Sequence, residues 1–344
     1  MPATTATRRR FILSGVPSMS SHPDTAIQAV GVVLVNWNGA GFTIPCIESL
    51  LAGSVTPDRI VVVDNASRDN SPELLAEKFP GIELIRNREN LGFTGANNIG
   101  ISRLMAEGCD YVWILNNDTT VDGECLGALK SYMAGHPEVS ACSGKILYAE
   151  PDQRIWYAGA RYDTWTMGFA HRGQGEDDTG QYESVEEVPF LSGCCMFVRR
   201  EALECVGLFD EHFFAYYEDS DWCLRAREAR LRLHYLPSAV IWHKVSATVN
   251  TLKKQRYGGT TSPFSVYITN RNRLFLIRKH AGNALQWCTA SIAFTAWFCY
   301  YSAALVLLFR INKCRALVMA VYDGITMPLD SSPGRAMTPR YLSY

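Results

Sequence analysis

Four short apolar runs, separated by segments of helical length, constrain the fold of this chain more than any other feature. Each run is continuous rather than alternating and ends in polar residues: VGVVLVNWNG, RIVVVDNAS, IELIRN and YVWILNND. Continuous apolarity indicates strands that are buried on both faces, as in a parallel sheet covered by helices. The segments 43–52, 71–79 and 95–106 have the length and spacing of helices, and Pro72 suits the first turn of the second. The pattern predicts an α/β fold that begins with a βαβαβ array.

The composition limits the kinds of molecule that the chain is expected to bind. The chain has 344 residues, with 33 basic and 34 acidic side chains and a formal net charge of -1, so we expect no nucleic-acid partner. A hydrophobic content of 47% is enough to form a full core. None of the eleven cysteines forms a C-x-x-C pair, which argues against a disulfide framework or a zinc site and favours a reducing, cytosolic setting. Cys194 and Cys195 are adjacent and are expected to serve packing, on opposite faces of a strand.

By composition the chain divides into five segments. They are a disordered N-terminal tail (1–27), an α/β domain (28–250), a connecting or lid segment (251–280), hydrophobic helices that associate with a membrane (281–327) and a C-terminal tail (328–344). Within the α/β domain, residues 149–188 are polar and contain several glycines, which fits either a mobile loop near the site or a solvated hairpin.

Residues 281–309 form a stretch of 29 residues without a formal charge, longer than the ~20 residues that cross a hydrocarbon core. Ser291, Thr295 and Ser302 dilute its apolar character on one helical face. Basic residues flank both ends, and a single span would place one basic cluster on the far side of the membrane, against the positive-inside tendency. A helix in the interface, or a hairpin, keeps both clusters in the cytoplasm. We expect attachment to the cytoplasmic face of the inner membrane; a buried core helix or a dimer seam is the alternative.

Polar side chains follow three of the four apolar runs. Ligands of open α/β sheets bind outside the carboxyl ends of the strands. Three such clusters, after the first, second and fourth runs, therefore predict one shared site. The clusters are Asn36, Trp37 and Asn38; Asp64 and Asn65; and Asn116, Asn117 and Asp118.

Five motifs occur in a fixed order: VVLVNWNG, VVVDNASRD, ENLGFTGANNIG, WILNNDT and GLFDEHFFAYYEDSDWCLR. Over residues 30–243 they resemble the motif series of family 2 glycosyltransferases with the GT-A fold, closest to the rhamnosyltransferase-like branch. The resemblance implies a Rossmann-like, mostly parallel sheet flanked by helices, here with a C-terminal hydrophobic helical extension. It also implies a nucleotide diphosphate sugar as donor, with rhamnose as the favoured sugar. The acceptor would be a hydroxyl of a lipid-linked or cell-surface glycan, or of a glycolipid.

The resemblance implies that the donor lies over the strand ends. Asp64 would bind the base or the ribose, and Trp37 would either stack on the donor or pack beneath the sheet. Glycines in NLGFTGANN would permit close approach of the backbone to the donor, and the two asparagines would offer amides at a helix start. The full set implied for the donor is Asn36, Trp37, Asn38, Asp64, Asn65, Gly92, Gly95, Asn97, Asn98, Asn116 and Asn117.

Departure of the diphosphate leaves negative charge, which a divalent cation, Mn²⁺ or Mg²⁺, offsets. NNDT resembles the D-x-D element of the family, but Asn116 stands where the first carboxylate is expected. Asp118 is therefore the implied metal ligand, and we expect weaker metal affinity than two carboxylates give. His243, in LPSAVIWHK, is the second implied ligand, and imidazole favours Mn²⁺ over Mg²⁺. The alternative for His243 is an ordinary core or surface histidine.

YYEDSDWCLR supplies the acid–base candidates. A carboxylate must reach the acceptor hydroxyl, and a helix N-terminus would keep it ionised. Asp219 is the implied base, and Glu218 would orient it or contact the acceptor. Asp221 and Arg225 are four residues apart and are predicted to form a structural ion pair. The sequence thus predicts an inverting glycosyltransferase that acts by a single displacement; the alternative is a non-catalytic nucleotide-sugar-binding subunit of a polysaccharide assembly complex.

Overall fold

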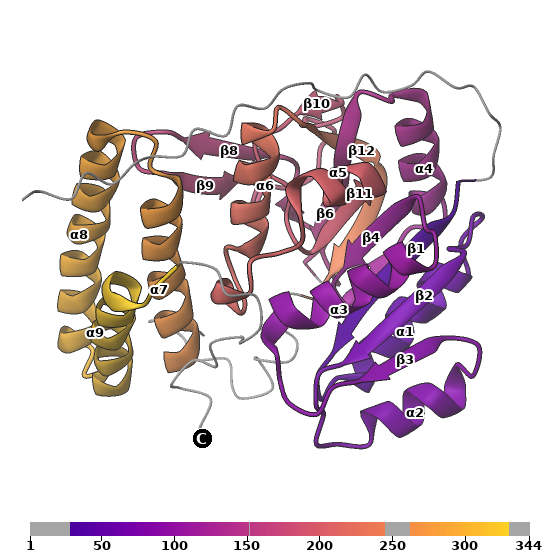
Figure 1. Ribbon diagram of the computed structural model, residues 1–344, viewed down its shortest axis with the longest axis horizontal. Coiled ribbons are helices and arrows are strands. Elements are labelled where there is room, and N and C mark those ends of the chain that lie inside the picture. Colours follow the sequence, from indigo (N-terminus) through magenta and orange to yellow (C-terminus); the bar gives the residue numbers. More distant parts are fainter. Residues whose placement is uncertain (1–27, 151, 245–261, 330–344) are drawn as a thin grey trace, which may run out of the picture.

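A ten-stranded sheet lies at the centre of the computed structural model, which describes residues 28–150, 152–244 and 262–329 (Figure 1). The predicted tail 1–27, residues 251–261 of the predicted connecting segment and most of the predicted tail 328–344 lie outside the described residues. Four strands in the spatial order β3-β2-β1-β4 pair in parallel. They are β1 (Val30–Asn36), β2 (Arg59–Asp64), β3 (Glu83–Arg86) and β4 (Tyr111–Leu115).

Beyond β4 the sheet becomes mixed. β11 inserts antiparallel between β4 and β6, and β12 then runs parallel to β6. The short β5 pairs with the end of β12 and places His243 opposite Thr119. The strands of this half are β5 (Thr119–Val121), β6 (Val139–Tyr148), β7 (Ile155–Tyr157), β10 (Glu186–Glu187), β11 (Cys195–Arg199) and β12 (Arg232–His243).

Six helices accompany the sheet: α1 (Ala40–Leu51), α2 (Ser71–Lys78), α3 (Gly92–Ala106), α4 (Cys125–Gly135), α5 (Arg200–Val206) and α6 (Glu218–Glu228). The helices predicted after the first three strands are confirmed, but α1 and α3 each begin three residues earlier than expected. For α3 the reason is Gly92, whose left-handed φ of +73° lets the chain turn directly into the helix. Asn97 and Asn98 consequently lie in its second turn, and the prediction that they stand at a helix start is wrong.

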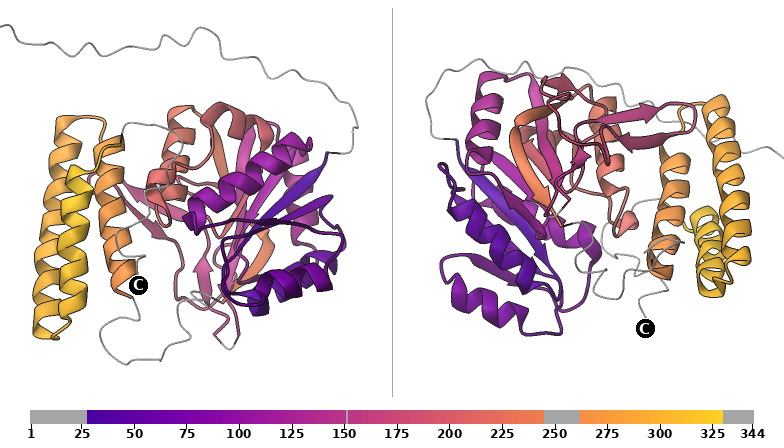
Figure 2. Two further views of the ribbon diagram at one scale, coloured as in Figure 1. Left: turned by 60° about the horizontal axis from the view of Figure 1, so that its bottom comes forward. Right: turned by 180° about the vertical axis from the view of Figure 1, so that it is seen from behind.

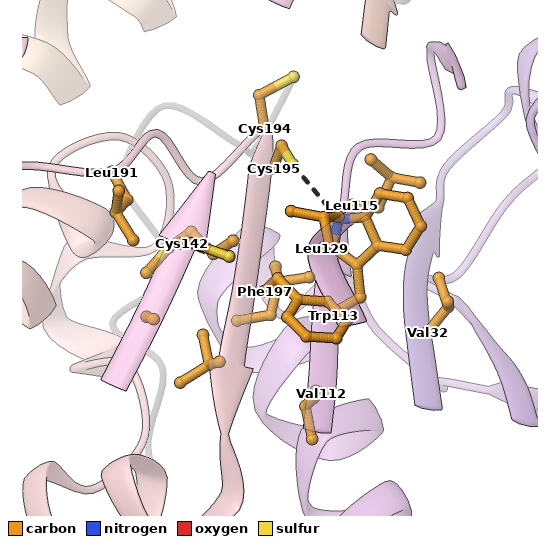
Figure 3. Close-up of a cluster of buried hydrophobic side chains, with 14 of the residues drawn as sticks. Val32, Val112, Trp113, Leu115, Leu129, Cys142, Leu191, Cys194, Cys195 and Phe197 are labelled. Carbon is orange, nitrogen blue, oxygen red and sulfur yellow. Dashed lines mark hydrogen bonds between the residues drawn. The ribbon is translucent and has the colours of Figure 1, made fainter. Parts of the chain in front are cut away.

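The core lies on both faces of the central strands, as the continuous apolar runs predicted (Figure 3). Every residue of β4 is buried. The Trp113 indole donates a hydrogen bond to Sγ of Cys195 at 3.3 Å, and the Phe197 ring stacks on Tyr111 with centroids 5.0 Å apart. All eleven cysteines have free thiols, and both Cys194 and Cys195 are buried. Packing, rather than a disulfide framework, therefore explains the cysteines of the core.

Three C-terminal helices pack together at the end of the molecule away from α2 (Figures 1 and 2). They are α7 (Pro263–His280), α8 (Ala284–Leu307) and α9 (Ile311–Thr326). The polar segment 149–188 contains the hairpin of β8 (Ala160–Asp163) and β9 (Gly168–His171), and its tip contacts α8. There Thr289 Oγ1 donates to the Trp165 carbonyl at 2.7 Å. The hairpin thus connects the sheet to these helices.

Candidate active site

A chain of hydrogen bonds joins the polar clusters that follow β2, β1 and β4. Asn36 Nδ2 donates to Asp64 Oδ1 at 2.8 Å, and Thr43 Oγ1 donates to Asn36 Oδ1 at 2.7 Å. Asn117 Nδ2 in turn donates to Thr43 Oγ1 at 2.8 Å. The three clusters therefore share one edge of the sheet. Asn36 itself is fully buried, and both the nitrogen and the oxygen of its side-chain amide bond to other protein groups. Thr43 was not predicted, because a threonine in an amphipathic helix carries no distinguishing signal.

The loop after β2 completes this edge. Asp64 accepts hydrogen bonds from both the backbone N–H and the hydroxyl of Ser67, the latter at 2.6 Å. Asn38 Oδ1 accepts from the Arg68 N–H at 2.7 Å, so this side chain holds the loop. Trp37 is 41% exposed, which excludes the alternative that it packs beneath the sheet.

The glycines of NLGFTGANN lie close to other atoms of the protein, and their approach to the donor stays a prediction. A Cβ at Gly92 would lie 2.3 Å from the carbonyl oxygen of Phe214, and one at Gly95 would lie 3.0 Å from Cβ of Leu91. Asn65 Nδ2 donates to the Gly92 carbonyl at 3.0 Å and so fixes the entry into α3. These residues hold the chain around Phe214.

The two asparagines of the same motif are also engaged with the protein. Asn98 Nδ2 donates to the Phe209 carbonyl at 2.9 Å, and the Phe209 N–H donates back to Asn98 Oδ1 at 3.0 Å. Asn97 Nδ2 donates to the Phe93 carbonyl within α3 at 2.9 Å. The Asn98 amide therefore fastens the segment that leads to α6, and the Asn97 amide bonds within α3. That these two residues bind the donor stays a prediction.

Asp118 and His243 lie side by side where β5 meets β12. Nε2 of His243 is 3.1 Å from Oδ1 of Asp118, and both residues are at least nine-tenths buried. Apart from this contact with Asp118, neither ring nitrogen of His243 has a hydrogen-bond partner among the described residues. Two ligands about 2.1 Å from one octahedral cation are about 3 Å apart, so this spacing fits a shared metal. Asn116 contributes a buried Oδ1, also without a hydrogen-bond partner.

Asp118 and His243 by themselves form an incomplete metal site. In residues 28–150, 152–244 and 262–329, no group of three or more His, Cys, Asp and Glu side chains is arranged to hold a metal ion. Asp118 and His243 supply one oxygen and one nitrogen, and a cation held by two protein ligands needs further oxygen ligands. Such a pair suits a cation that arrives with, and is completed by, phosphate oxygens.

Glu218 and Asp219 begin α6 and face the turn before β11. Asp219 Oδ2 accepts the Gly193 N–H at 2.9 Å, and its Oδ1 accepts the Ser220 N–H at 2.7 Å. A Cβ at Gly193 would lie 3.4 Å from Asp219 Oδ2 and 3.5 Å from Glu218 Oε1. The absence of a side chain at Gly193 therefore leaves both carboxyl groups open on that side. Gly193 was not predicted, since one glycine before a strand is a common turn.

Burial raises the pKa values of the two carboxyl groups to different extents. It raises the pKa of Glu218 well above its usual value, and the adjacent Asp219 charge adds to this. Burial also raises the pKa of Asp219, although the Gly193 and Ser220 donors oppose it. That the helix N-terminus keeps Asp219 ionised therefore stays a prediction. Glu218, whose Oε2 has no hydrogen-bond partner within the part of the chain that the structure describes, therefore holds its proton to a higher pH than Asp219 does.

The two halves of the site meet at Cys194. The Asn116 N–H donates to the Cys194 carbonyl at 3.0 Å, next to Gly193, which holds Asp219. Burial raises the pKa of the Cys194 thiol, and the charges of Asp118 and Asp219 raise it further. Two backbone N–H groups, of Asn116 and of Gly193, thus link the segment before Asp118 to Asp219 through the turn at 193–194. The aspartates predicted for the metal and for the base lie on the same side of the molecule.

The family model described as glycosyl transferase family 2 matches residues 31–207, just over half of the chain. The chain belongs to glycosyl transferase family 2. This enzyme is 29% identical over 222 residues to the N-acetylglucosaminyl-diphospho-decaprenol L-rhamnosyltransferase of Mycobacterium tuberculosis, which covers 59% of the chain and 72% of that protein. It is 26% identical over 228 residues to the dTDP-rhamnosyl transferase RfbF of Shigella flexneri, covering 64% and 71% respectively. It is thus a rhamnosyltransferase-like glycosyltransferase.

Solved structures show the same GT-A fold. The crystal structure of GalNAc-T7 with UDP, GalNAc and Mn²⁺ matches with a TM-score of 0.54 and 17% identity, over 74% of this chain and 51% of that one. This glycosyltransferase therefore spans about half of that protein. S. aureus TarS 1-349 in complex with UDP-GlcNAc matches with a TM-score of 0.54 and 14% identity, over 86% and 80%.

The predicted ion pair of α6 is confirmed and forms part of a larger network in this glycosyltransferase. Arg225 Nε lies 2.9 Å from Asp221 Oδ2. Lys279 Nζ and His280 Nε2, at the end of α7, lie 2.7 Å and 2.8 Å from Asp221 Oδ1. The carboxylate is completely buried. α6 is therefore tied to α7, a contact that residue spacing along α6 could not reveal.

Proposed function

We propose that this enzyme transfers a sugar, rhamnose in the first instance, from a nucleotide diphosphate donor to a hydroxyl of a lipid-linked or cell-surface glycan, with inversion at the anomeric carbon. What supports the proposal is that Asp118 and His243 lie 3.1 Å apart, and that the turn at 193–194 bonds both Asn116, near Asp118, and Asp219. The names of the rhamnosyltransferase relatives support the choice of sugar and of a lipid-linked acceptor.

The donor would lie over the ends of β1, β2 and β4. Asp64 would bind the base or the ribose, and the exposed ring of Trp37 would stack on the base. Asp118 and His243 would hold Mn²⁺ or Mg²⁺, and the cation would offset the charge that develops on the departing diphosphate. Asn116 is held beside this pair and would donate its amide to a diphosphate oxygen.

Asp219 would act as the general base. The acceptor oxygen attacks the anomeric carbon as its proton passes to Asp219, and the bond from the anomeric carbon to the phosphate oxygen breaks, its electron pair leaving with the diphosphate. Attack from the face opposite the leaving group in one displacement inverts the configuration. Glu218, protonated beside it, would donate a hydrogen bond to the acceptor and keep a second negative charge out of the pair.

The C-terminal helices would attach the enzyme to the cytoplasmic face of the membrane. α8 is long and apolar enough to cross a membrane, and 17% of its most apolar window is buried, which argues against the alternative of a core helix. Ile292 and Leu307 are 69% and 77% exposed. Because α9 and α7 pack along α8, a transmembrane α8 would draw the basic end of α7 toward hydrocarbon. We therefore propose an interfacial orientation, with 28–250 as the catalytic domain and 281–327 as the membrane-associating part.

Transfer with purified protein tests the catalytic proposal. The wild type is supplied with dTDP-rhamnose, Mn²⁺ and a prenyl-diphosphate-linked sugar acceptor, and turnover is compared with that of Asp219→Asn. We expect the variant to lose about 10²–10⁴-fold in kcat while it still binds the donor. Asp152→Asn, at an exposed ion pair with Arg154, is the matched control. Equal turnover of the Asp219 variant and the wild type would remove Asp219 as the base.

Vesicle flotation tests the membrane proposal. The full chain should float with vesicles that contain phosphatidylglycerol, and Ile292→Glu with Leu307→Glu should abolish flotation. Leu74→Glu, an exposed apolar position on α2, is the control and should float like the wild type. A wild-type protein that stays in the soluble fraction would contradict the proposal.

A further inference from the structure

The segment that leads into the catalytic helix has an unusual backbone. Phe214, Tyr216 and Tyr217 all adopt left-handed conformations, with φ values of +62°, +65° and +71°. Each such residue carries backbone strain and persists only where its surroundings hold it. Tyr217 directly precedes Glu218 and Asp219, so any relaxation of this segment moves the acid pair.

Two side chains of α7 hold most of the segment. Arg271 and Asn272 are completely buried, and their N–H groups point at backbone carbonyls of residues 212–216. Arg271 Nη2 donates to His212 at 2.9 Å and Phe213 at 3.2 Å, and Asn272 Nδ2 donates to Phe213 at 2.8 Å, Ala215 at 2.9 Å and Tyr216 at 2.7 Å.

The opposite side of the segment is held by α3, where the Thr94 N–H donates to the Phe214 carbonyl at 3.0 Å. The segment is therefore clamped between two helices that come from different parts of the chain. The Arg271 guanidinium packs over Phe275, 4.9 Å from the ring centroid, which fixes the plane of its donors. Neither α7 side chain contacts the strand ends where the donor is proposed to bind.

We propose that Arg271 and Asn272 are positioning residues of the transfer reaction: by holding the carbonyls of residues 212–216, they set where Asp219 stands relative to the acceptor hydroxyl. The inference rests on the proposed function. Because they act on the base and not on the donor edge, their loss affects the chemical step rather than donor binding.

Asn272→Ala is compared with Asn270→Ala to test this. Asn270 lies on the same helix and is also buried, but its amide donates to the Val266 carbonyl and accepts from the Trp297 indole. We expect Asn272→Ala to lower kcat about 100-fold, with the KM for the donor changed by less than about twofold. Asn270→Ala should retain a kcat close to that of the wild type. Thermal melts of both variants report their stability.

A kcat for Asn272→Ala equal to that of Asn270→Ala, or a loss confined to KM, would overturn the inference. If Asn272→Ala does not fold, Arg271→Lys, which keeps the charge but loses the planar donors, is measured in the same way and judged by the same outcomes. A wild type without transferase activity would refute the proposed function instead. Wild-type turnover with unaffected α7 variants would refute the positioning role alone.

Discussion

Replacement of Asp221 by asparagine should destabilise the enzyme strongly, although the residue does not touch the proposed substrates. Its carboxylate is completely buried and contacts three cationic or potentially cationic groups, on Arg225, Lys279 and His280, at 2.7–2.9 Å. An asparagine of the same shape retains one acceptor but removes the negative charge. Arg225 then loses its carboxylate partner, whereas Lys279 loses one of two and keeps Asp210, 2.5 Å from its Nζ.

Breaking a buried ion pair from one side costs about 3–5 kcal/mol. The Arg225 and Lys279 side chains are 20% and 27% exposed, so water compensates part of this loss, and we expect about 3 kcal/mol. At 2–4 °C per kcal/mol for a chain of this size, that corresponds to a decrease in Tm of roughly 6–12 °C.

The dependence on pH follows from the pKa of Asp221. Burial alone would raise it, but the His280 hydrogen bond and the charges of Arg225 and Lys279 outweigh burial and lower it. The stabilisation is therefore present above the unfolded pKa of about 3.9 and is lost as the pH falls through the lower folded value. The difference in Tm between wild type and Asp221→Asn should be full near neutral pH and shrink in acid.

Differential scanning calorimetry near pH 7 measures the effect, with Asp152→Asn as the control for loss of an aspartate charge at the surface. A Tm for Asp221→Asn no lower than that of the control would refute the claim that this network stabilises the fold.

Three further predictions follow from the site. Glu218→Gln should raise the Tm relative to wild type, by an amount that grows as the pH rises above the usual carboxyl pKa of 4.5. Burial raises the pKa of Glu218 in the folded protein, so its ionisation destabilises the fold. A difference in Tm that is the same at about pH 5 and pH 8 would contradict this. Gly92→Ala should cost at least about 3 kcal/mol in urea unfolding, since its Cβ meets the Phe214 carbonyl, whereas Gly108→Ala, also at positive φ but in open space, should cost about 1 kcal/mol. Chelation should abolish transfer, and His243→Ala should raise the Mn²⁺ concentration for half-maximal turnover at least about tenfold; an unchanged requirement would exclude His243 as a ligand.

Much of the architecture was predictable because its signals are local. The four apolar runs became β1 to β4, and the helices between them appeared within a few residues of their expected bounds. The resemblance also predicted that Asp118 and His243 share a site, and they lie 3.1 Å apart. α8 formed where the long uncharged stretch 281–309 indicated a helix, whereas α7 formed in the segment 251–280 that was predicted only as a connection or lid.

The roles of particular polar residues were less predictable, because a side-chain amide bonds whatever donor or acceptor the fold brings to it. Asn98 contacts Phe209, 111 residues away, and Asn272 contacts Phe213, 59 residues away. Motif membership assigned the first of these to the donor and gave no role to the second. The ionisation of Glu218 and Asp219 likewise depended on burial, which the helix-start pattern did not contain.

The sequence by itself determined the strands, the helices and the kinds of side chain at the strand ends, because apolar periodicity and backbone preference act over a few neighbouring residues. Only the tertiary structure decided which carbonyls Arg271 and Asn272 hold, which carboxyl group retains a proton and what Gly92 must avoid. Those outcomes depend on distances and solvent exclusion between segments that are far apart along the chain.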